Sequence, residues 1–311
     1  MRHFSGFEAA AGEVDGAALA LGTFDGLHRG HQALIGAAIG WARAHDRLSV
    51  VVTFDPPPVA VLAPHLFRAP LLSLAQKLDC LAALGADAVV VQPFDRAFAD
   101  REALAFVEDD LIAALAPSAI FVGENFNFGR GRVGNAAMLR AIAANRGVEL
   151  FTPLLVQENA IIISSTEIRR QLDQGDVATA SRLLGRLYAI EGTIQHGRAR
   201  GRCMGFPTAN LDASGRFLPL GGVYAARARV DEELFQPAVV NIGTKPTFGE
   251  RDTTVEAFLL DETRELYGRT LCLEFIARLR AEEHFDSTAA LCQQIELDCR
   301  RAREILEALS S

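Results

Sequence analysis

The sequence contains very little lysine. Of its 31 Lys and Arg residues, only Lys77 and Lys245 are lysines. A Walker-type phosphate loop needs a Gly-Lys-Ser/Thr triplet, and no such triplet occurs, so this class of ATP-binding proteins is excluded. A Schiff-base enzyme would have to use one of these two lysines as its nucleophile.

The sequence also lacks a basic excess and a long apolar run. Its 39 Asp and Glu residues give a net charge of −8, which argues against a nucleic-acid-binding protein. No apolar run approaches the roughly 20 residues of a membrane span. Residues 1–16 have no cationic segment followed by an apolar one, so we expect no signal peptide. We therefore predict no nucleic-acid partner and no membrane partner.

Cysteines are few and have no metal-binding spacing. There are five, an odd number, and no Cys-x-x-Cys pair, which argues against both a disulfide framework and a zinc site. We interpret them as reduced thiols, and we expect a cytoplasmic protein. They are Cys80, Cys203, Cys272, Cys292 and Cys299.

The length of 311 residues, half of them apolar, indicates two domains. In the first half, short continuous apolar runs alternate with amphipathic stretches, as in an α/β doubly wound parallel sheet. The expected strands are 17–22, 48–54, 86–91 and 118–122, and the expected helices are 31–45, 73–84, 101–115, 135–145, one after Ser164, and 177–184.

From Tyr188 onwards the pattern changes to alternation of apolar and polar residues, which predicts a small antiparallel β-barrel or sandwich. Within 271–279, Leu271, Leu273, Phe275 and Leu279 are expected on one side of a strand. Apolar residues at helical spacing predict a C-terminal helix over 287–309, with Leu309 on its packed face. The change of period predicts two domains, 1–182 and 183–311. The other expected barrel strands are 223–230, 237–242 and 253–260.

The first expected strand leads directly into a glycine-rich motif, Gly-Thr-Phe-Asp-Gly-Leu-His-Arg-Gly-His, at residues 22–31. The start of a βα unit is where open parallel sheets bind nucleotides, and a helix N-terminus attracts phosphate. His28 and His31 could both donate hydrogen bonds to phosphoryl oxygens as charge develops on them. The alternative is a glycine-rich turn with two ordinary surface histidines, and the surrounding motif favours the phosphate site.

A second motif, Ile-Ser-Ser-Thr-Glu-Ile-Arg at residues 163–169, places three hydroxyls at a helix start and an arginine one turn later. Ser164 and Glu167 have the spacing of a capping box, so a plain helix cap is the alternative. The combination with the histidine motif favours a second phosphate-binding element.

Together these two motifs resemble the nucleotidyltransferase superfamily, which attacks the α-phosphate of a nucleoside triphosphate and expels pyrophosphate. Residues 122–129, with Arg130, Arg132 and Gly134, resemble the flavin-side segment of bacterial FAD synthetases. The resemblance implies that His28 and His31 are catalytic and that Phe54 and Asn125 contact the flavin. It implies ATP contacts by Gly22, Phe24, Asp25, His28, Gly30, His31, Ser164, Ser165, Thr166 and Arg169.

The second half contains the only local cluster of basic residues, three arginines interleaved with glycines over 196–205, followed by Gly-Phe-Pro-Thr-Ala-Asn at 205–210. Thr208 and Asn210 offer neutral oxygens suited to Mg²⁺ that is also bound by phosphate. From these residues alone, a solvated basic hairpin loop is the favoured interpretation.

The motifs at 205–210, 221–224, 241–248, 255–257 and 266–268, extended by 278–287, occur in the order typical of riboflavin kinases. The whole chain therefore resembles the bacterial bifunctional riboflavin kinase/FMN adenylyltransferases. This resemblance implies phosphorylation of riboflavin to FMN by ATP, adenylylation of FMN to FAD, and Mg²⁺ as cofactor. The partners are then the small molecules riboflavin, FMN and ATP.

The kinase resemblance also implies residue roles. Glu256 would be the catalytic carboxylate that takes the proton of the ribityl hydroxyl. Thr208 and Asn210 would ligate Mg²⁺, and Asn241 and Arg280 would contact the flavin. ATP would be bound by Gly197, Arg202, Gly205, Thr208 and Asn210.

The sequence departs from the family pattern at residues 54–58. Phe-Asp-Pro-Pro-Pro stands where Phe-Glu-Pro-His-Pro is common, so Pro57 removes an imidazole and Asp55 shortens a carboxylate. Asn127, Asn135 and Lys245 are smaller departures. They leave two alternatives open: a riboflavin kinase with an impaired or dead adenylyltransferase site, or a flavin-sensing binding protein. A cytidylyl- or pantetheine-phosphate-type transferase with an unrelated barrel is disfavoured by the 205–210 motif, and the sequence does not predict the oligomeric state.

Overall fold

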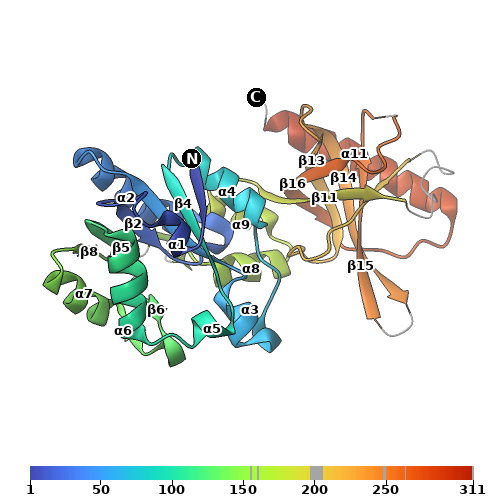
Figure 1. Cartoon of the computed structure of the whole chain (residues 1–311). Coiled ribbons are helices and arrows are strands. Elements are labelled where there is room, and N and C mark those ends of the chain that lie inside the picture. Colours follow the sequence, from blue (N-terminus) through green and yellow to red (C-terminus); the bar gives the residue numbers. More distant parts are fainter. Residues whose placement is uncertain (155, 160, 197–205, 248–249, 263, 310–311) are drawn as a thin grey trace. The chain divides into compact units, whose positions relative to one another are not determined.

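The computed structural model describes residues 1–154, 156–159, 161–196, 206–247, 250–262 and 264–309. It divides into two compact units, Met1–Ser164 and Ser165–Ser311. Figure 1 shows a sheet flanked by helices in the first unit and a barrel in the second. Within the described part of the chain, none of the helices combines the length and the hydropathy of a membrane span.

A parallel sheet of six strands forms the centre of the first unit, in the order β1-β4-β3-β2-β5-β8. The central strands are buried along almost their whole length, which is why they appear in the sequence as continuous apolar runs. Every pairing in the sheet is parallel. The strands are β1 (Arg2–Ser5), β2 (Ala18–Leu21), β3 (Ser49–Asp55), β4 (Ala88–Pro93), β5 (Ala119–Val122) and β8 (Glu149–Phe151).

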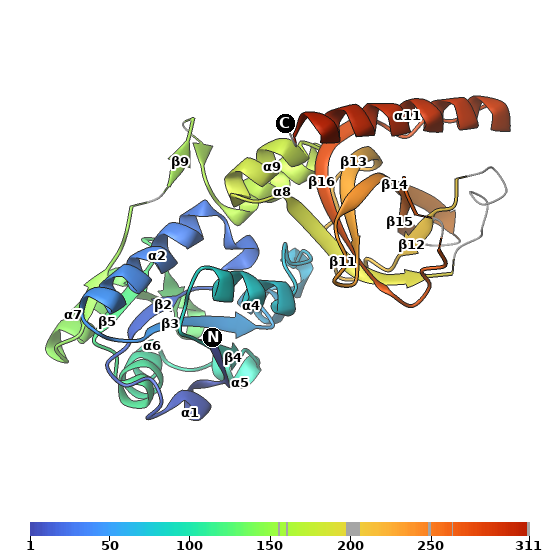
Figure 2. The same cartoon turned by 90° about the horizontal axis from the view of Figure 1, so that it is seen from above.

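Helices cover both faces of this sheet (Figure 2). α2 (Arg29–Ala44) and α4 (Leu74–Ala83) pack on one face through Ile35, Ala38 and Leu81. α1 (Phe7–Ala10), the π-helical segment η3 (Phe106–Ala113) and α7 (Ala136–Asn145) pack on the other. The predicted doubly wound sheet is therefore confirmed. Shorter elements are η1 (Asp25–Leu27), α3 (Pro58–Leu62), η2 (Pro64–Leu66), α5 (Arg96–Ala99), α6 (Ala103–Ala105), η4 (Arg130–Arg132), and the hairpins β6 (Asn127–Phe128) with β7 (Gly134–Asn135) and β9 (Gln157–Glu158) with β10 (Ile161–Ile162).

The strand order reverses at β2, which lies between β3 and β5. At such a switch point the loops that follow neighbouring strands diverge to opposite faces of the sheet and leave a crevice at their carboxyl ends. The loops after β2, β3 and β5 all begin at this edge of the sheet.

The second unit begins with α8 (Ser165–Asp173) and α9 (Val177–Leu184) and continues into a closed six-stranded barrel. α9 packs on β11 and β16, and the Leu220 amide donates to the Leu172 carbonyl of α8 at 2.8 Å. The barrel order is β11 (Tyr188–Gln195), β12 (Ala209–Leu211), β15 (Glu250–Leu259), β14 (Gln236–Thr247), β13 (Gly222–Val230) and β16 (Thr270–Arg280). The predicted antiparallel barrel is confirmed.

The units divide at Ser164, so α8 and α9 group with the barrel, although the predicted boundary placed α8 and most of α9 in the first domain. This division shows which residues pack together as compact units, and it does not define the catalytic domains. The boundary between the two catalytic domains at 182/183 stays a prediction.

The long C-terminal helix α11 (Thr288–Ala308) lies against β13, β14 and β16 (Figure 2). Two expectations about this region are wrong. Leu309 is 65% exposed, while the buried face of the helix contains Asp298, Ala302 and Leu306. Leu279 packs with Ala302 of α11, because register shifts between β13 and β16 interrupt the alternation that begins at Leu271.

Candidate functional sites

The loop after β2 has a strained, tightly packed backbone. A Cβ atom at Gly22 would lie 3.0 Å from the Phe24 ring, and Phe24 is buried in the left-handed region at φ +48°. Non-glycine residues in this region persist only where neighbouring groups hold them. One such tie is made by Asp25, whose carboxylate accepts the Leu71 amide at 2.9 Å. The loop is therefore a fixed feature at the carboxyl edge of the sheet.

His28 and His31 lie together at the start of α2. His28 is the N-cap of the helix, and its Nδ1 accepts the His31 backbone amide at 3.3 Å. A neutral His28 therefore carries its proton on Nε2. The two imidazoles stack with ring centroids 3.5 Å apart, and a Cβ at Gly30 would come within 3.1 Å of His28 Nδ1. The glycine in His-x-Gly-His leaves room for this stack.

His31 is neutral at physiological pH. Burial first, then the neighbouring His28 and the charge of Lys77, hold the pKa of its imidazole well below the usual range. Its Nδ1 atom is buried and has no hydrogen-bond partner within the described part of the chain. A buried polar atom of this kind needs a partner, and a bound ligand is one way to supply it.

Two further predicted residues lie at or just after strand ends at the same edge of the sheet. Phe54 lies near the end of β3 and is buried against Phe94 and Phe98, with ring centroids 5.8 and 6.2 Å away. Asn125 follows β5 and is exposed, and its carbonyl accepts the Asn127 side-chain amide at 2.8 Å. The sheet topology thus brings the histidine motif, Phe54 and Asn125 to one edge.

The hydroxyl motif begins in the first unit and ends in the second. Ile163 is buried, and its carbonyl would lie 3.6 Å from a Cβ at Gly30, so this part of the motif lies beside the start of α2. An ion pair between Arg29 and Glu158 ties the β9–β10 hairpin to the same turn. The remaining motif residues, Ser165, Thr166 and Arg169, belong to α8 in the second unit.

In the barrel, three predicted residues form one row across three adjacent strands. Asn210 of β12 is paired with Glu256 of β15, and Glu256 is paired with Asn241 of β14. Directly paired side chains share a face, with Cβ atoms about 4.5–5.5 Å apart. All three are half-buried, whereas their neighbours Val255 and Ala257 are buried, so the row lies on the outer face of the barrel.

The neighbourhood of this row contains groups that the sequence analysis did not assign. A Cβ at Gly243 would lie 2.5 Å from Glu282 Oε1 and 3.3 Å from Asn241 Nδ2, so the Glu282 carboxylate lies close to Asn241. Phe258, two residues after Glu256, packs edge-on against Phe206 at 5.5 Å between ring centroids. Alternation along β15 could have revealed Phe258. Glu282 lies beyond β16 and shows no such pattern.

Arg280, predicted at the flavin, lies in a nearly buried ion pair. Its guanidinium donates to the Asp298 carboxylate from Nε at 3.0 Å and from Nη2 at 2.9 Å. The Gln294 side-chain amide also donates to Asp298, at 3.0 Å. Asp298 is 4% exposed, so this pair fastens α11 to the end of β16.

The predicted ATP residues Gly197, Arg202 and Gly205 lie outside the described residues. The structure describes the strand end before them, where the His196 ring stacks on Tyr267 at 3.8 Å between ring centroids.

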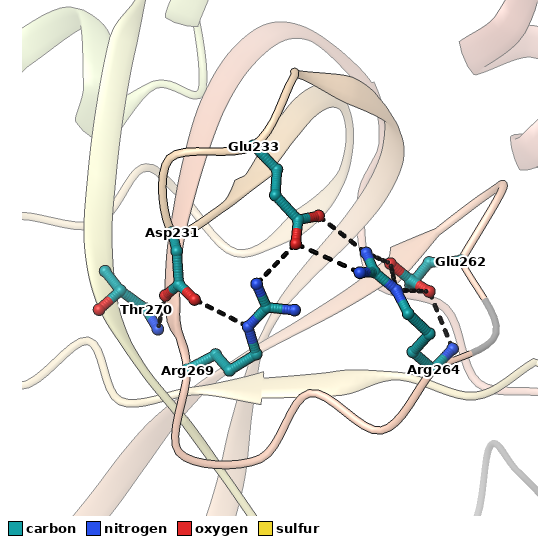
Figure 3. Close-up of polar contacts among 6 residues, drawn as sticks. All are labelled: Asp231, Glu233, Glu262, Arg264, Arg269 and Thr270. Carbon is teal, nitrogen blue, oxygen red and sulfur yellow. Dashed lines mark hydrogen bonds and ion pairs between the residues drawn. The ribbon is translucent and has the colours of Figure 1, made fainter.

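The loop that contains Tyr267 is tied down by an ion-pair network (Figure 3). Arg269 donates to Asp231 and Glu233, and Arg264 donates to Glu233 and Glu262. The two arginines lower the pKa of Glu233 to about 2. Glu233 therefore stays ionised and bonded to both arginines over the physiological pH range.

Two family models match the chain: FAD synthetase over residues 11–167, and riboflavin kinase over residues 184–306. The bifunctional riboflavin kinase/FMN adenylyltransferase of Escherichia coli K12 is 37% identical over 290 residues, which is 93% of each chain. The protein of the same name from Bacillus subtilis is 35% identical over 290 residues, 91% of this chain and 90% of that one.

Among solved structures, one from Streptococcus pneumoniae superposes with a TM-score of 0.88 at 29% identity, covering 97% of this chain and 98% of that one. That protein is named a macrolide-efflux protein, a name that differs from those of the sequence relatives. The likeness covers both compact units.

Proposed function

The chain belongs to the family of bifunctional riboflavin kinase/FMN adenylyltransferases and is an enzyme of both kinds, and we propose the residues through which each reaction proceeds. The kinase domain converts riboflavin and ATP to FMN and ADP. The adenylyltransferase domain converts FMN and ATP to FAD and pyrophosphate. The matches cover residues 11–167 and 184–306, and we place the boundary between the two catalytic domains at 182/183.

In the kinase reaction, Glu256 acts as general base. Its carboxylate takes the proton of the ribityl 5′-hydroxyl while that oxygen attacks the γ-phosphate of ATP and the bond to ADP breaks. The observation that supports this role is the row on the barrel surface. Glu256 lies between the amides of Asn210 and Asn241, which can orient substrate without neutralising the carboxylate.

The donor set beside this row fits Mg²⁺. The described residues contain no group of three His, Cys, Asp or Glu side chains that could hold a metal by themselves. Mg²⁺ seldom takes an all-protein cage and usually shares its coordination with phosphate and water. We propose that Thr208 and Asn210 supply neutral oxygens to it, and that Gly197, Arg202 and Gly205 bind the phosphates. When bound, the ion neutralises charge on the transferred phosphoryl group.

The flavin side of the kinase site is assigned to Asn241 and Arg280. Asn241 follows from its place in the row. Arg280 is held in one orientation by Asp298, and a fixed guanidinium can present its remaining donor face to a polar ring edge.

In the adenylyltransferase reaction, an FMN phosphate oxygen attacks the α-phosphate of ATP and the bond to pyrophosphate breaks, without a covalent enzyme intermediate. His28 and His31 donate hydrogen bonds to the leaving phosphates. The observation that supports this is the buried His31 Nδ1, which has no partner among the described residues, on an imidazole kept neutral by its surroundings. Gly22, Phe24, Asp25 and Gly30 shape the loop that receives ATP, and Phe54 and Asn125 contact the flavin.

Ser164, Ser165, Thr166 and Arg169 complete the ATP site in this proposal. Their support is the family motif, since only Ser164 belongs to the same compact unit as the histidines. We also propose a cytoplasmic location, where riboflavin, FMN and ATP are the only partners required. The cysteines in the described part of the chain are all free thiols, as expected there.

The test is product analysis. The purified chain is incubated with riboflavin, ATP and Mg²⁺, and the fluorescent flavins are separated by chromatography. We expect FMN first and FAD after it. FMN alone would restrict the enzyme to the kinase reaction, as the Pro57 departure allows, and unchanged riboflavin would refute both activities.

Glu256→Gln separates the two sites. Loss of a general base should slow FMN formation by about 10²–10⁴-fold, while supplied FMN is still converted to FAD. Glu274→Gln is the matched control, because Glu274 is also a barrel carboxylate and is paired with Arg227. Equal loss of both reactions in folded Glu256→Gln protein would contradict the assignment.

A further inference from the structure

Lys77, one of the two lysines of the chain, is buried beside the proposed adenylyltransferase site. It lies on α4 and is 8% exposed. Burial of an ammonium group is costly unless polar partners receive it. Its Nζ donates to the Thr23 carbonyl at 2.8 Å and lies 3.4 Å from Thr53 Oγ1. The Thr53 hydroxyl donates to the same carbonyl at 3.1 Å, so the Thr23 carbonyl accepts two hydrogen bonds.

The Thr23 carbonyl is part of the peptide that enters the strained residue Phe24. Phe24 is held at φ +48°, and its ring packs edge-to-face with the His31 ring, with centroids 5.3 Å apart. A phenylalanine with its backbone in the left-handed region persists only if neighbouring groups hold it there. The hydrogen bonds to the Thr23 carbonyl therefore restrain Phe24, and the buried Phe24 ring in turn restrains the His31 imidazole.

We propose that Lys77 is a positioning residue for adenylyl transfer: it holds the Thr23 carbonyl, and through Phe24 it holds the His31 ring, in the orientation that meets the ATP phosphates. This inference rests on the proposed role of His31. It assigns a function to Lys77, which has no role in either reaction as proposed above.

The charge of Lys77 gives a second, separable effect. Among the described residues, the charged and titratable groups that act on Lys77 or His31 are Asp25 from η1, Asp55 from the end of β3, and His28 at the N-cap of α2. Burial lowers the pKa of Lys77 more than the two aspartates raise it, and the lysine in turn lowers the pKa of His31. Removal of the lysine should therefore raise the pKa of His31, and the imidazole would lose its neutral form at a higher pH.

The test compares Lys77→Met with Lys77→Arg in the full-length chain. In Lys77→Met we expect kcat for conversion of FMN to FAD to fall by about tenfold to 10²-fold, because small displacements of a reacting group have effects of that size. The KM for ATP should change less, and the acid limb of the pH–rate profile should move to higher pH. Lys77→Arg, which keeps the charge and a donor, should keep the acid limb of the wild type.

Thr53→Val separates position from charge. It removes one of the two hydrogen bonds to Thr23 and leaves the lysine charge, so we expect a lower kcat with an unshifted acid limb. FMN formation from riboflavin, measured on the same samples, should stay within about twofold of the wild type in every variant, because the kinase residues lie in the other compact unit.

The outcomes are distinguishable. A wild-type chain that makes no FAD would refute the proposed adenylyltransferase site itself. A Lys77→Met chain with the FAD turnover and pH profile of the wild type would overturn the role of Lys77 and leave the proposed function standing. If Lys77→Met does not fold, as judged by Trp41 fluorescence, Lys77→Gln is measured in its place, and an unshifted acid limb with unchanged kcat overturns the proposal.

Discussion

Replacement of Asp298 by alanine should destabilise the barrel unit and leave the sheet unit unchanged. The Asp298 carboxylate on α11 receives four hydrogen bonds from two side chains, at 2.9, 3.0 and 3.2 Å from Arg280 and at 3.0 Å from Gln294. Bidentate, charge-assisted hydrogen bonds of this kind are among the strongest polar contacts in proteins. In Asp298→Ala the Arg280 guanidinium loses its counter-charge, although the Arg280 side chain is only 15% exposed.

The size of the effect follows from this geometry. Removal of one partner of a buried ion pair costs about 3–5 kcal/mol. Here Arg280 Nη1 still donates to the Ala281 carbonyl at 3.1 Å, and the guanidinium lies over the Phe285 ring at 5.5 Å. We therefore expect the lower end of the range, about 3 kcal/mol, or about a hundredfold in the unfolding equilibrium. With a slope of about 2 kcal/mol per molar urea, the midpoint falls by about 1.5 M.

The chain supplies its own probes for this measurement. Its single tryptophan, Trp41, lies on α2 in the sheet unit, and its three tyrosines, Tyr188, Tyr224 and Tyr267, all lie in the barrel unit. Urea unfolding is therefore followed by tryptophan fluorescence for one unit and by second-derivative tyrosine absorbance for the other. Only the tyrosine transition should move.

Asp261→Ala is the matched control. Asp261 is paired with Arg303 of the same helix, but both side chains are about half exposed, and such surface pairs contribute about 0–1 kcal/mol. If Asp298→Ala shifted the midpoint no more than Asp261→Ala, the argument from burial would be refuted. Asp298→Leu combined with Arg280→Met should recover most of the stability. A raised KM for riboflavin in that stable double variant would support the flavin contact of Arg280.

Gly129→Ala should destabilise the sheet unit by about 1–3 kcal/mol, because Gly129 has φ +73° and a Cβ there would lie 2.5 Å from the Ala103 Cα. Gly131→Ala, at φ +65° but with its nearest neighbour 3.9 Å away, is the control, and equal losses by Trp41 fluorescence would show that the contact with Ala103 is unimportant. The stability of the sheet unit should also fall as pH drops below about 6.5, since unfolded His31 binds a proton that the folded form, with its lowered pKa, resists. His31→Gln should flatten that dependence in urea titrations between pH 5 and 8, and an unchanged slope would contradict the pKa argument.

Much of the fold could be predicted from local sequence. A strand buried on both faces must be apolar throughout, so β2, β3, β4 and β5 are visible as runs. The edge strands β1 and β8 were not predicted, because one side of each is solvated and neither has an uninterrupted apolar run. The histidine motif could also be recognised from the sequence, since its glycines and imidazoles lie within a single βα turn.

The rest depended on pairing between distant residues, which no local period encodes. Asn210, Glu256 and Asn241 become neighbours only through the register of three barrel strands. Lys77 reaches Thr23 only because α4 packs on the same face of the sheet as α2, with Lys77 beside Thr53 of β3.

By itself, the sequence determined the order of the central strands and main helices, the two kinds of sheet and the chemical groups at each motif, because these follow from residues near one another in the chain. Only the tertiary structure decided which polar groups would be buried together. Asp298 is buried on a helix face that otherwise follows the apolar pattern, and Leu279 faces α11 because the pairing of β16 slips. The free energy of such a group depends on the partner that packing brings to it. That partner is set by the three-dimensional fold rather than by the adjacent sequence.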